Sequence, residues 1–92
     1  MPRVGLTRHL FQFFPDLEGR ALEVDGSTVR EVVEEMEALA PGFAFYVCDE
    51  RGRLRQHVNA FVDKDRVADR TTLTDAVPAG STVHFIQALS GG

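Results

Sequence analysis

The chain has 92 residues, a formal net charge of −4 and a single cysteine. This length suits one domain with a modest core, and one cysteine excludes an internal disulfide or a four-thiolate iron–sulfur cluster. The ten basic residues are scattered along the sequence, so we expect neither nucleic acid nor an anionic membrane as a partner. The sequence has no signal-peptide pattern and no apolar run of membrane-spanning length, which predicts a soluble cytoplasmic protein.

The first quarter of the chain predicts two strands joined by an apolar connection. Residues 3–8 (RVGLTR) and 21–26 (ALEVDG) both alternate apolar side chains with small or polar ones. Such alternation is typical of half-buried strands, here in a hairpin-like unit. The connection contains three phenylalanines that we expect to pack against the core: Phe11, Phe13 and Phe14.

The stretch STVREVVEEMEALAPG predicts the main helix, which the Pro-Gly pair ends. Apolar residues recur on one face at helical spacing: Val29, Val32, Val33, Met36, Leu39 and Ala40. Thr28 and Glu31 form a capping-box pattern, with Ser27 as an alternative cap. Arg30 stands one turn before Glu34, so we expect these two side chains to pair.

The second half of the chain predicts further strands. Residues 43–62 suggest two strands around the polar turn at 49–53, with 58–62 (VNAFV) the more buried of the two. Leu73 and Val77 are expected to anchor an irregular connection before the last strand. The order ββαβββ indicates an α+β domain, with a mixed sheet of about four to five strands packed on one main helix. We therefore predict a β-grasp fold.

The last predicted strand runs into two glycines: STVHFIQALSGG, residues 81–92. This ending resembles that of ubiquitin in residue type and spacing. TVREVVEEMEALAPGF resembles the single helix of the MoaD/ThiS family of small sulfur carriers, and DERGRLRQHVNAFVDKDRV resembles their hairpin and the strand after it. The resemblance covers nearly the whole chain. It implies one ubiquitin-like β-grasp domain over residues 1–92, with a flexible tail over about 88–92.

The resemblance also implies a chemistry. In this family the carboxylate of the last glycine, here Gly92, is adenylated and then converted to a thiocarboxylate that donates sulfur. A MoeB/ThiF-like adenylating enzyme would use ATP and Mg²⁺, a sulfurtransferase or sulfide would supply sulfur, and a synthase would accept it. We expect no cofactor bound by this chain and no enzymatic activity of its own, because it lacks a phosphate-binding G-x-x-x-x-G-K-[ST] loop.

Glycine suits a tail that enters another protein's active site, because it lacks a Cβ and adopts conformations that other residues avoid. The residues expected to thread such a channel are Leu89, Ser90 and Gly91. Many family members carry prolines just before the end, whereas this chain has QALSGG, so the choice of partner enzyme stays open. The receiving pathway also stays open among molybdopterin, thiamine, cysteine and related metabolites.

A partner-binding surface follows from the alternation of side chains along strands. If Val83 and Phe85 face the helix, their neighbours on the last strand face away. The family register places Ala60 and Val62 inward and leaves Phe61 on the outer face, although Phe61 could instead belong to the core. The predicted partner-binding residues are Phe61, His84, Ile86 and Ala88.

The sequence supports neither a metal site nor a reactive thiol. The three histidines have no ligand spacing, and we expect no metal site. Cys48 lies in an apolar stretch and is expected to be a small core residue rather than a reactive thiol. Three alternatives to a sulfur carrier remain: a modifier joined through Gly92 to lysines, a small subunit of a molybdopterin-synthase-like complex, and an interaction domain in which the Gly-Gly pair has no role.

Overall fold

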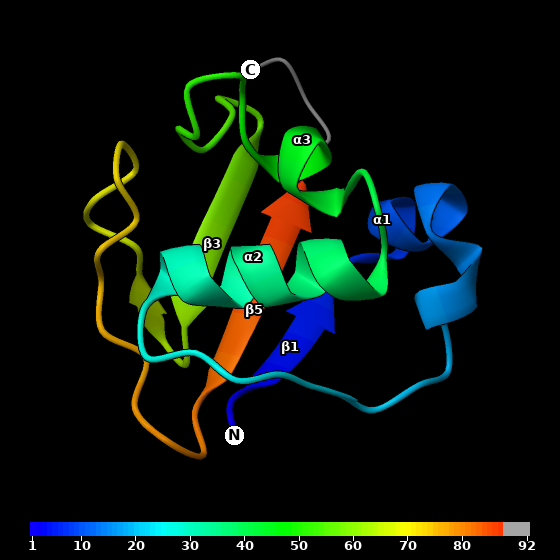
Figure 1. Ribbon diagram of the computed structural model, residues 1–92, viewed down its shortest axis with the longest axis horizontal. Coiled ribbons are helices and arrows are strands. Elements are labelled where there is room, and N and C mark those ends of the chain that lie inside the picture. Colours follow the sequence, from blue (N-terminus) through cyan, green and yellow to red (C-terminus); the bar gives the residue numbers. More distant parts are fainter. Residues whose placement is uncertain (88–92) are drawn as a thin grey trace.

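The computed structural model describes residues 1–87 of the chain. Five strands form one mixed sheet in the order β2-β1-β5-β3-β4, with β1 and β5 parallel at its centre and the other neighbours antiparallel. The strands are β1 (Arg3–Leu6), β2 (Leu22–Glu23), β3 (Val58–Val62), β4 (Asp65–Arg66) and β5 (Thr82–Gln87). Helix α2 (Val29–Leu39) crosses one face of this sheet (Figure 1). This is the predicted β-grasp.

The core lies between α2 and the sheet. On α2, Val29, Val32, Val33 and Met36 are buried, as the helical spacing predicted. Leu39 is 43% exposed, which contradicts the prediction, because it lies in the last turn at the edge of the apolar stripe. The irregular connection is anchored as predicted by two buried side chains, Leu73 and Val77.

Thr28 caps the start of α2 as predicted, whereas the alternative cap, Ser27, precedes the cap position and its hydroxyl donates to the Glu31 carboxylate. The Thr28 hydroxyl accepts a hydrogen bond from the Glu31 amide at 3.2 Å, while the Glu31 carboxylate accepts from the Ser27 amide at 2.7 Å. The first bond satisfies a backbone donor that the helix leaves without a partner in its first turn, and the second holds the residue before the cap against α2. The predicted Arg30–Glu34 pair is wrong, because the Arg30 guanidinium donates to the carbonyl oxygens of two loops that pack beside α2.

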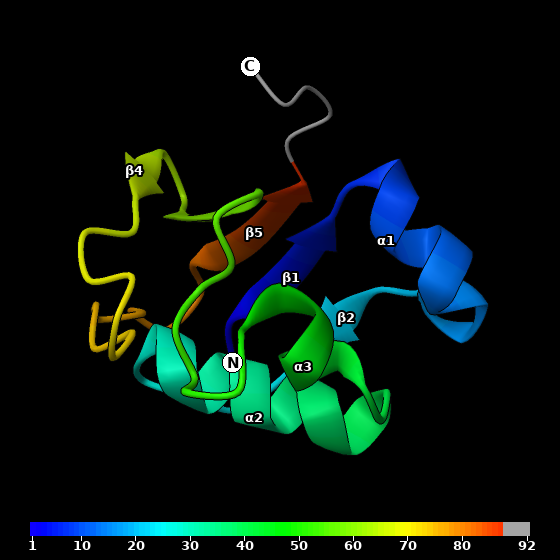
Figure 2. The same cartoon turned by 90° about the horizontal axis from the view of Figure 1, so that it is seen from above.

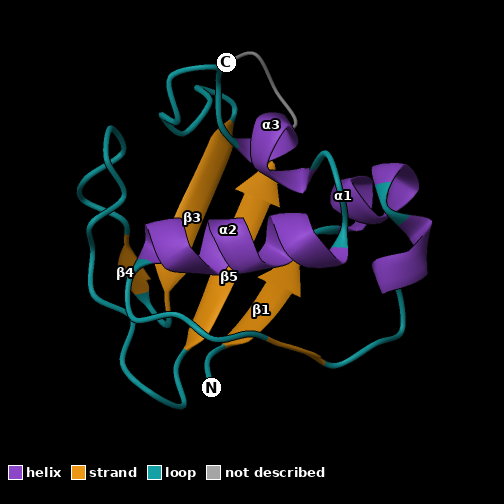
Figure 3. Cartoon of the chain, in the orientation of Figure 1, coloured by secondary structure: helices purple, strands orange, loops and turns teal. Residues whose placement is uncertain are grey.

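The connection between β1 and β2 is helical rather than irregular. It contains α1 (Arg8–Phe13) and a 3₁₀ turn, η1 (Pro15–Leu17), beside the edge of the sheet (Figure 3). Phe11 and Phe14 pack against the core as predicted. Phe13 does not, since 57% of its surface is exposed.

The segment expected to be a strand after α2 is a short helix, α3 (Phe43–Val47). The Glu37 carboxylate accepts hydrogen bonds from the Gly42 amide at 3.0 Å and the Ala44 amide at 2.8 Å, so α2 itself caps α3. Gly42 has φ 99°, a left-handed conformation that glycine adopts without strain. Figure 2 shows α2 and α3 on the same side of the sheet. Within residues 1–87, no helix is long and apolar enough to cross a membrane.

Candidate functional site

The sheet has an outer face that α2 does not cover. Along β5, Val83 and Phe85 are fully buried, whereas His84 is exposed and Ile86 is 36% exposed. On β3, Ala60 is fully buried, and Val62 is half-buried and packs against the core. The predicted alternation of the two strands is therefore confirmed.

Register brings the predicted surface residues together. Phe61 of β3 pairs directly with His84 of β5, and the next pair on this face joins Asn59 to Ile86. Phe61 is half-buried and lies outside the core cluster, with the Arg66 guanidinium 5.8 Å from the centroid of its ring. The outer face thus presents apolar side chains next to an imidazole and a guanidinium. We define Phe61, His84 and Ile86 as the outer patch.

A glycine beneath His84 is a part of this surface that sequence reasoning missed. Gly5 of β1 lies opposite His84, and a Cβ at Gly5 would be 2.6 Å from His84 Nδ1. The imidazole therefore lies over β1, in space that only a glycine leaves open. A glycine inside a predicted strand signals such a close approach, so RVGL contained a usable indication.

The end of β5 is held from both sides. The Tyr46 hydroxyl donates to Gln87 Oε1 at 3.0 Å, and the Gln87 amide donates to Thr7 Oγ1 at 3.4 Å. Gln87 is the last residue that the structure describes, and we call this end of β5 the tail root. The residues predicted to form the tail or to contact a partner through it, Ala88, Leu89, Ser90, Gly91 and Gly92, lie outside the described residues.

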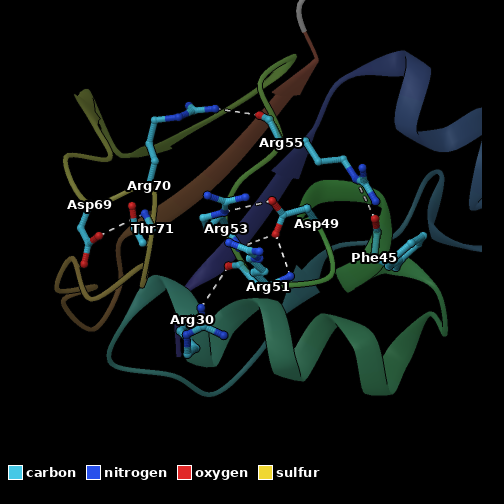
Figure 4. Close-up of polar contacts among 10 residues, drawn as sticks. Arg30, Phe45, Asp49, Arg51, Arg53, Arg55, Asp69, Arg70 and Thr71 are labelled. Carbon is cyan, nitrogen blue, oxygen red and sulfur yellow. Dashed lines mark hydrogen bonds and ion pairs between the residues drawn. The ribbon is translucent and has the colours of Figure 1, made fainter.

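The arginine-rich turn after α3 is built from internal contacts (Figure 4). The Asp49 carboxylate accepts from the amides of Arg51 and Arg53 and pairs with the Arg53 guanidinium at 3.1 Å. Desolvation would raise the pKa of Asp49, but these amides and the Arg53 charge outweigh it and lower that pKa. Arg70 donates to the carbonyl oxygens of Arg55 and Val58. Several charges of this region therefore serve the local structure.

The other candidate groups show no sign of catalytic use. Cys48 is 5% exposed, and desolvation raises the pKa of its thiol, so the thiolate is disfavoured. The prediction of a small core residue is confirmed. Among the described residues, no group of three or more histidine, cysteine, aspartate or glutamate side chains could hold a metal ion.

Solved structures share this fold over nearly the full chain. A chain of the Amycolatopsis orientalis BexX/CysO complex superposes with a TM-score of 0.83 at 22% identity, covering 100% of both chains. Mycobacterium tuberculosis CysO gives 0.82 at 24% identity, covering 97% of this chain and 100% of that one. SAMP1 from Haloferax volcanii gives 0.70 at 23% identity, covering 98% and 97%. At these identities the likeness concerns the fold.

Membership of a family comes from the sequence itself. The comparison with curated proteins finds no match. The model of the ThiS family matches residues 9–92, a span that includes all of α1 except Arg8, η1, α2, α3, strands β2 to β5, and the Gly-Gly pair after the tail root. The match and the β-grasp topology agree, and the chain belongs to the ThiS family.

Proposed function

We propose that this chain is a sulfur carrier whose Gly92 carboxylate is activated by a partner and converted to a thiocarboxylate. The observation that carries the proposal is the ThiS family match through Gly92, joined to a sheet whose central strand leads to that glycine. The chain acts in this proposal as a protein cosubstrate, and it binds no cofactor itself. It works in the cytoplasm, where its partner enzymes and ATP are found.

Formation of the thiocarboxylate needs two partner-catalysed steps. The Gly92 carboxylate attacks the α-phosphorus of ATP, held with Mg²⁺ in a MoeB/ThiF-like adenylating enzyme, and pyrophosphate leaves. Sulfide then displaces AMP and leaves the thiocarboxylate. Alternatively, the persulfide of a sulfurtransferase displaces AMP to form an acyl disulfide, and a second thiol reduces this bond, which releases the thiocarboxylate as that thiol forms a disulfide with the sulfurtransferase cysteine. A synthase finally takes the sulfur for a molybdopterin, thiamine, cysteine or related biosynthetic intermediate. Leu89, Ser90 and Gly91 thread the partner's channel in both steps.

The outer patch supplies a docking surface in this proposal. Phe61, His84 and Ile86 lie next to one another across β3 and β5, and β5 leads directly to Ala88 and the reacting glycine. Contiguous exposed apolar side chains at one place mark sites of protein association. A partner bound there would hold the domain with its tail aimed at the activating site.

Mass spectrometry of the intact protein tests this function. Protein purified from its native host, or incubated with the cognate adenylating enzyme, ATP, Mg²⁺ and sulfide, should gain about 16 Da as one carboxyl oxygen is replaced by sulfur. The protein lacking Gly91 and Gly92 should gain nothing. A terminus that remains a plain carboxylate under all these conditions would show that the sulfur-carrier proposal is wrong.

A second candidate function has its own support. The fold is also that of SAMP1 from Haloferax volcanii, and a second structure from this organism is described as small archaeal modifier protein 1. A modifier would form an isopeptide bond between Gly92 and lysines of other proteins. Lysines that carry the C-terminal peptide 71–92 through an isopeptide bond after tryptic digestion of native-host extracts, absent when this chain is deleted, would favour this function, because the last tryptic site of the chain follows Arg70.

A further inference from the structure

Two phenylalanines are strongly exposed on the helical side of the molecule. Phe13 of α1 is 57% exposed and Phe45 of α3 is 63% exposed. Half-buried Tyr46 belongs to the same surface, since its ring centroid lies 4.7 Å from that of Phe13. The Arg55 guanidinium lies 4.8 Å from the centroid of the Phe45 ring. Phe45 directly precedes Tyr46 in α3, and on this ground we call Phe13, Phe45 and Tyr46 the aromatic ridge, with Arg55 at its edge.

The ridge adjoins the tail root. Tyr46 belongs to the ridge and also donates its hydroxyl hydrogen bond to Gln87. Gln87 lies two residues after Phe85 on β5, so both side chains are on the same face of the sheet. The Phe85 side chain lies in the core beneath the helices. The ridge therefore lies next to the tail root on the helical side of the sheet, through Tyr46. Ile86 lies next to the tail root on the outer side. Figure 1 shows α3 over the end of β5.

We propose that the aromatic ridge is a second contact surface for the enzyme that receives the tail. This inference rests on the proposed function, in which Gly92 reacts inside a partner. Gly92 is the fifth residue after Gln87, so the chain between them spans at most about 18 Å. An enzyme that encloses Gly92 must then approach the tail root closely, and its surface covers the side chains around that root on both sides of the sheet.

The ridge also defines the chemistry of the surface that fits it. Aromatic residues, phenylalanine among them, and arginine are enriched in protein interfaces relative to the rest of the surface. The Arg55 Nε atom donates to the Phe45 carbonyl at 2.9 Å, which fixes the guanidinium beside the ring (Figure 4). The partner surface should therefore be apolar opposite Phe13 and Phe45 and should carry a carboxylate opposite Arg55.

Site-specific photo-cross-linking in the native host tests the ridge. The variants Phe13→p-benzoylphenylalanine, Phe45→p-benzoylphenylalanine and Ile86→p-benzoylphenylalanine should each cross-link to the same adenylating enzyme. The cross-links should disappear when Gly91 and Gly92 are deleted. The variant Ala79→p-benzoylphenylalanine is the matched control, because Ala79 is exposed in the loop before β5, at the other end of that strand.

The outcomes separate this inference from its alternatives. Capture of the enzyme from position 86 alone would overturn it, as would the absence of a tail-dependent cross-link from positions 13 and 45. Cross-links between two copies of this chain would also overturn it and would assign the ridge to self-association. If positions 13 and 45 capture a tail-dependent partner but Gly92 is never thiocarboxylated, the ridge stands and the sulfur-carrier proposal fails.

Kinetics with the captured enzyme give the quantitative test. Phe45→Ser and Arg55→Gln should each raise the KM for this chain in ATP-dependent pyrophosphate release at least tenfold, with kcat changed less than twofold. Arg3→Gln is the charge control, since Arg3 is exposed at the opposite end of the central strands. Unchanged KM values in both ridge variants, with thiocarboxylate still formed on Gly92, would overturn the proposal that the ridge contacts the enzyme and would leave the proposed function intact.

Discussion

Gly5 lies directly beneath the imidazole of His84 on the outer face of the sheet, and it keeps that imidazole close to β1. The Gly5→Ala variant would place a Cβ 2.6 Å from His84 Nδ1. Because the ring must move away, we expect the free energy of unfolding to fall by about 1 kcal/mol, at the low end of overpacking effects. Urea unfolding measures this change.

The control for Gly5 reverses the sign of the effect. In a His84→Ala background nothing clashes, and alanine is favoured over glycine inside a strand by roughly 0.5–1 kcal/mol. Gly5→Ala should therefore stabilise the His84→Ala protein. Equal destabilisation in both backgrounds would show that the imidazole does not occupy the space above Gly5.

Asp69 stabilises the loop that carries the buried Leu73. Its carboxylate accepts hydrogen bonds from the Thr72 side chain and amide and from the Thr74 side chain, which hold its pKa well below the usual range. An unfolded aspartate has a pKa of about 3.9. The ionised carboxylate therefore contributes stability in full above about pH 4, and this contribution is lost as pH falls through the lower folded pKa.

The Asp69→Asn variant tests this dependence. Its free energy of unfolding should be lower than that of the unmodified protein at pH 7, and the difference should narrow between pH 4 and pH 2. Urea unfolding across this range measures it. The exposed Asp16 on η1 provides the control, since Asp16→Asn removes a carboxylate of the same type without touching this loop. If the difference in unfolding free energy between Asp69→Asn and the unmodified protein stayed constant at all pH values, the stabilising role of the ionised Asp69 carboxylate would be contradicted.

At the scale of elements, α3 exists because α2 provides its cap. Glu37 accepts hydrogen bonds from the amides of Gly42 and Ala44, and these bonds lower the pKa of Glu37. In Glu37→Ala the first turn of α3 loses its acceptor, which we expect to lower the free energy of unfolding by about 1 kcal/mol. Backbone chemical shifts over residues 43–47 should move away from helical values.

The control for Glu37 is on the same helix. Glu35 is exposed on α2, and Glu35→Ala should leave both the unfolding free energy and the shifts of α3 nearly unchanged. Helical shifts retained in Glu37→Ala would show that α3 forms without the cap. In that case Phe43 and Val47, which are both fully buried, would hold the segment in place.

Elements with a clear local period could be predicted from the sequence, whereas α3, which depends on a cap from α2, could not. β5 and α2 were predictable because each shows one clear period over six or more residues. Phe43–Val47 contains five apolar or aromatic residues, which fit a short strand or a helix equally well, and the deciding carboxylate belongs to another element. For the site, alternation predicted the outer patch. The contacts at the tail root join residues 41 and 80 positions apart, which no local pattern reveals.

At the scale of the whole molecule, β5 separates a core that stabilises the fold from an exposed outer face, which we propose as the partner-binding side. Phe85 is fully buried, with its ring edge-on to Phe43 at a centroid distance of 5.4 Å. Its neighbour Ile86 points to the opposite side. Substitution of Phe85 should therefore lower the stability of the fold, whereas substitution of its neighbour Ile86 should weaken partner binding.

Truncating each neighbour tests this separation. Phe85→Ala should lower the free energy of unfolding by about 3–5 kcal/mol, because it opens a cavity in the core. Ile86→Ser should change it by no more than about 0.5 kcal/mol, as is usual for surface substitutions, while raising the KM for this chain in the adenylating enzyme's pyrophosphate release. Urea unfolding and steady-state kinetics on the same preparations measure the two effects. An Ile86→Ser protein with an unchanged KM would remove Ile86 from the outer patch, and a large loss of stability in that variant would return it to the core.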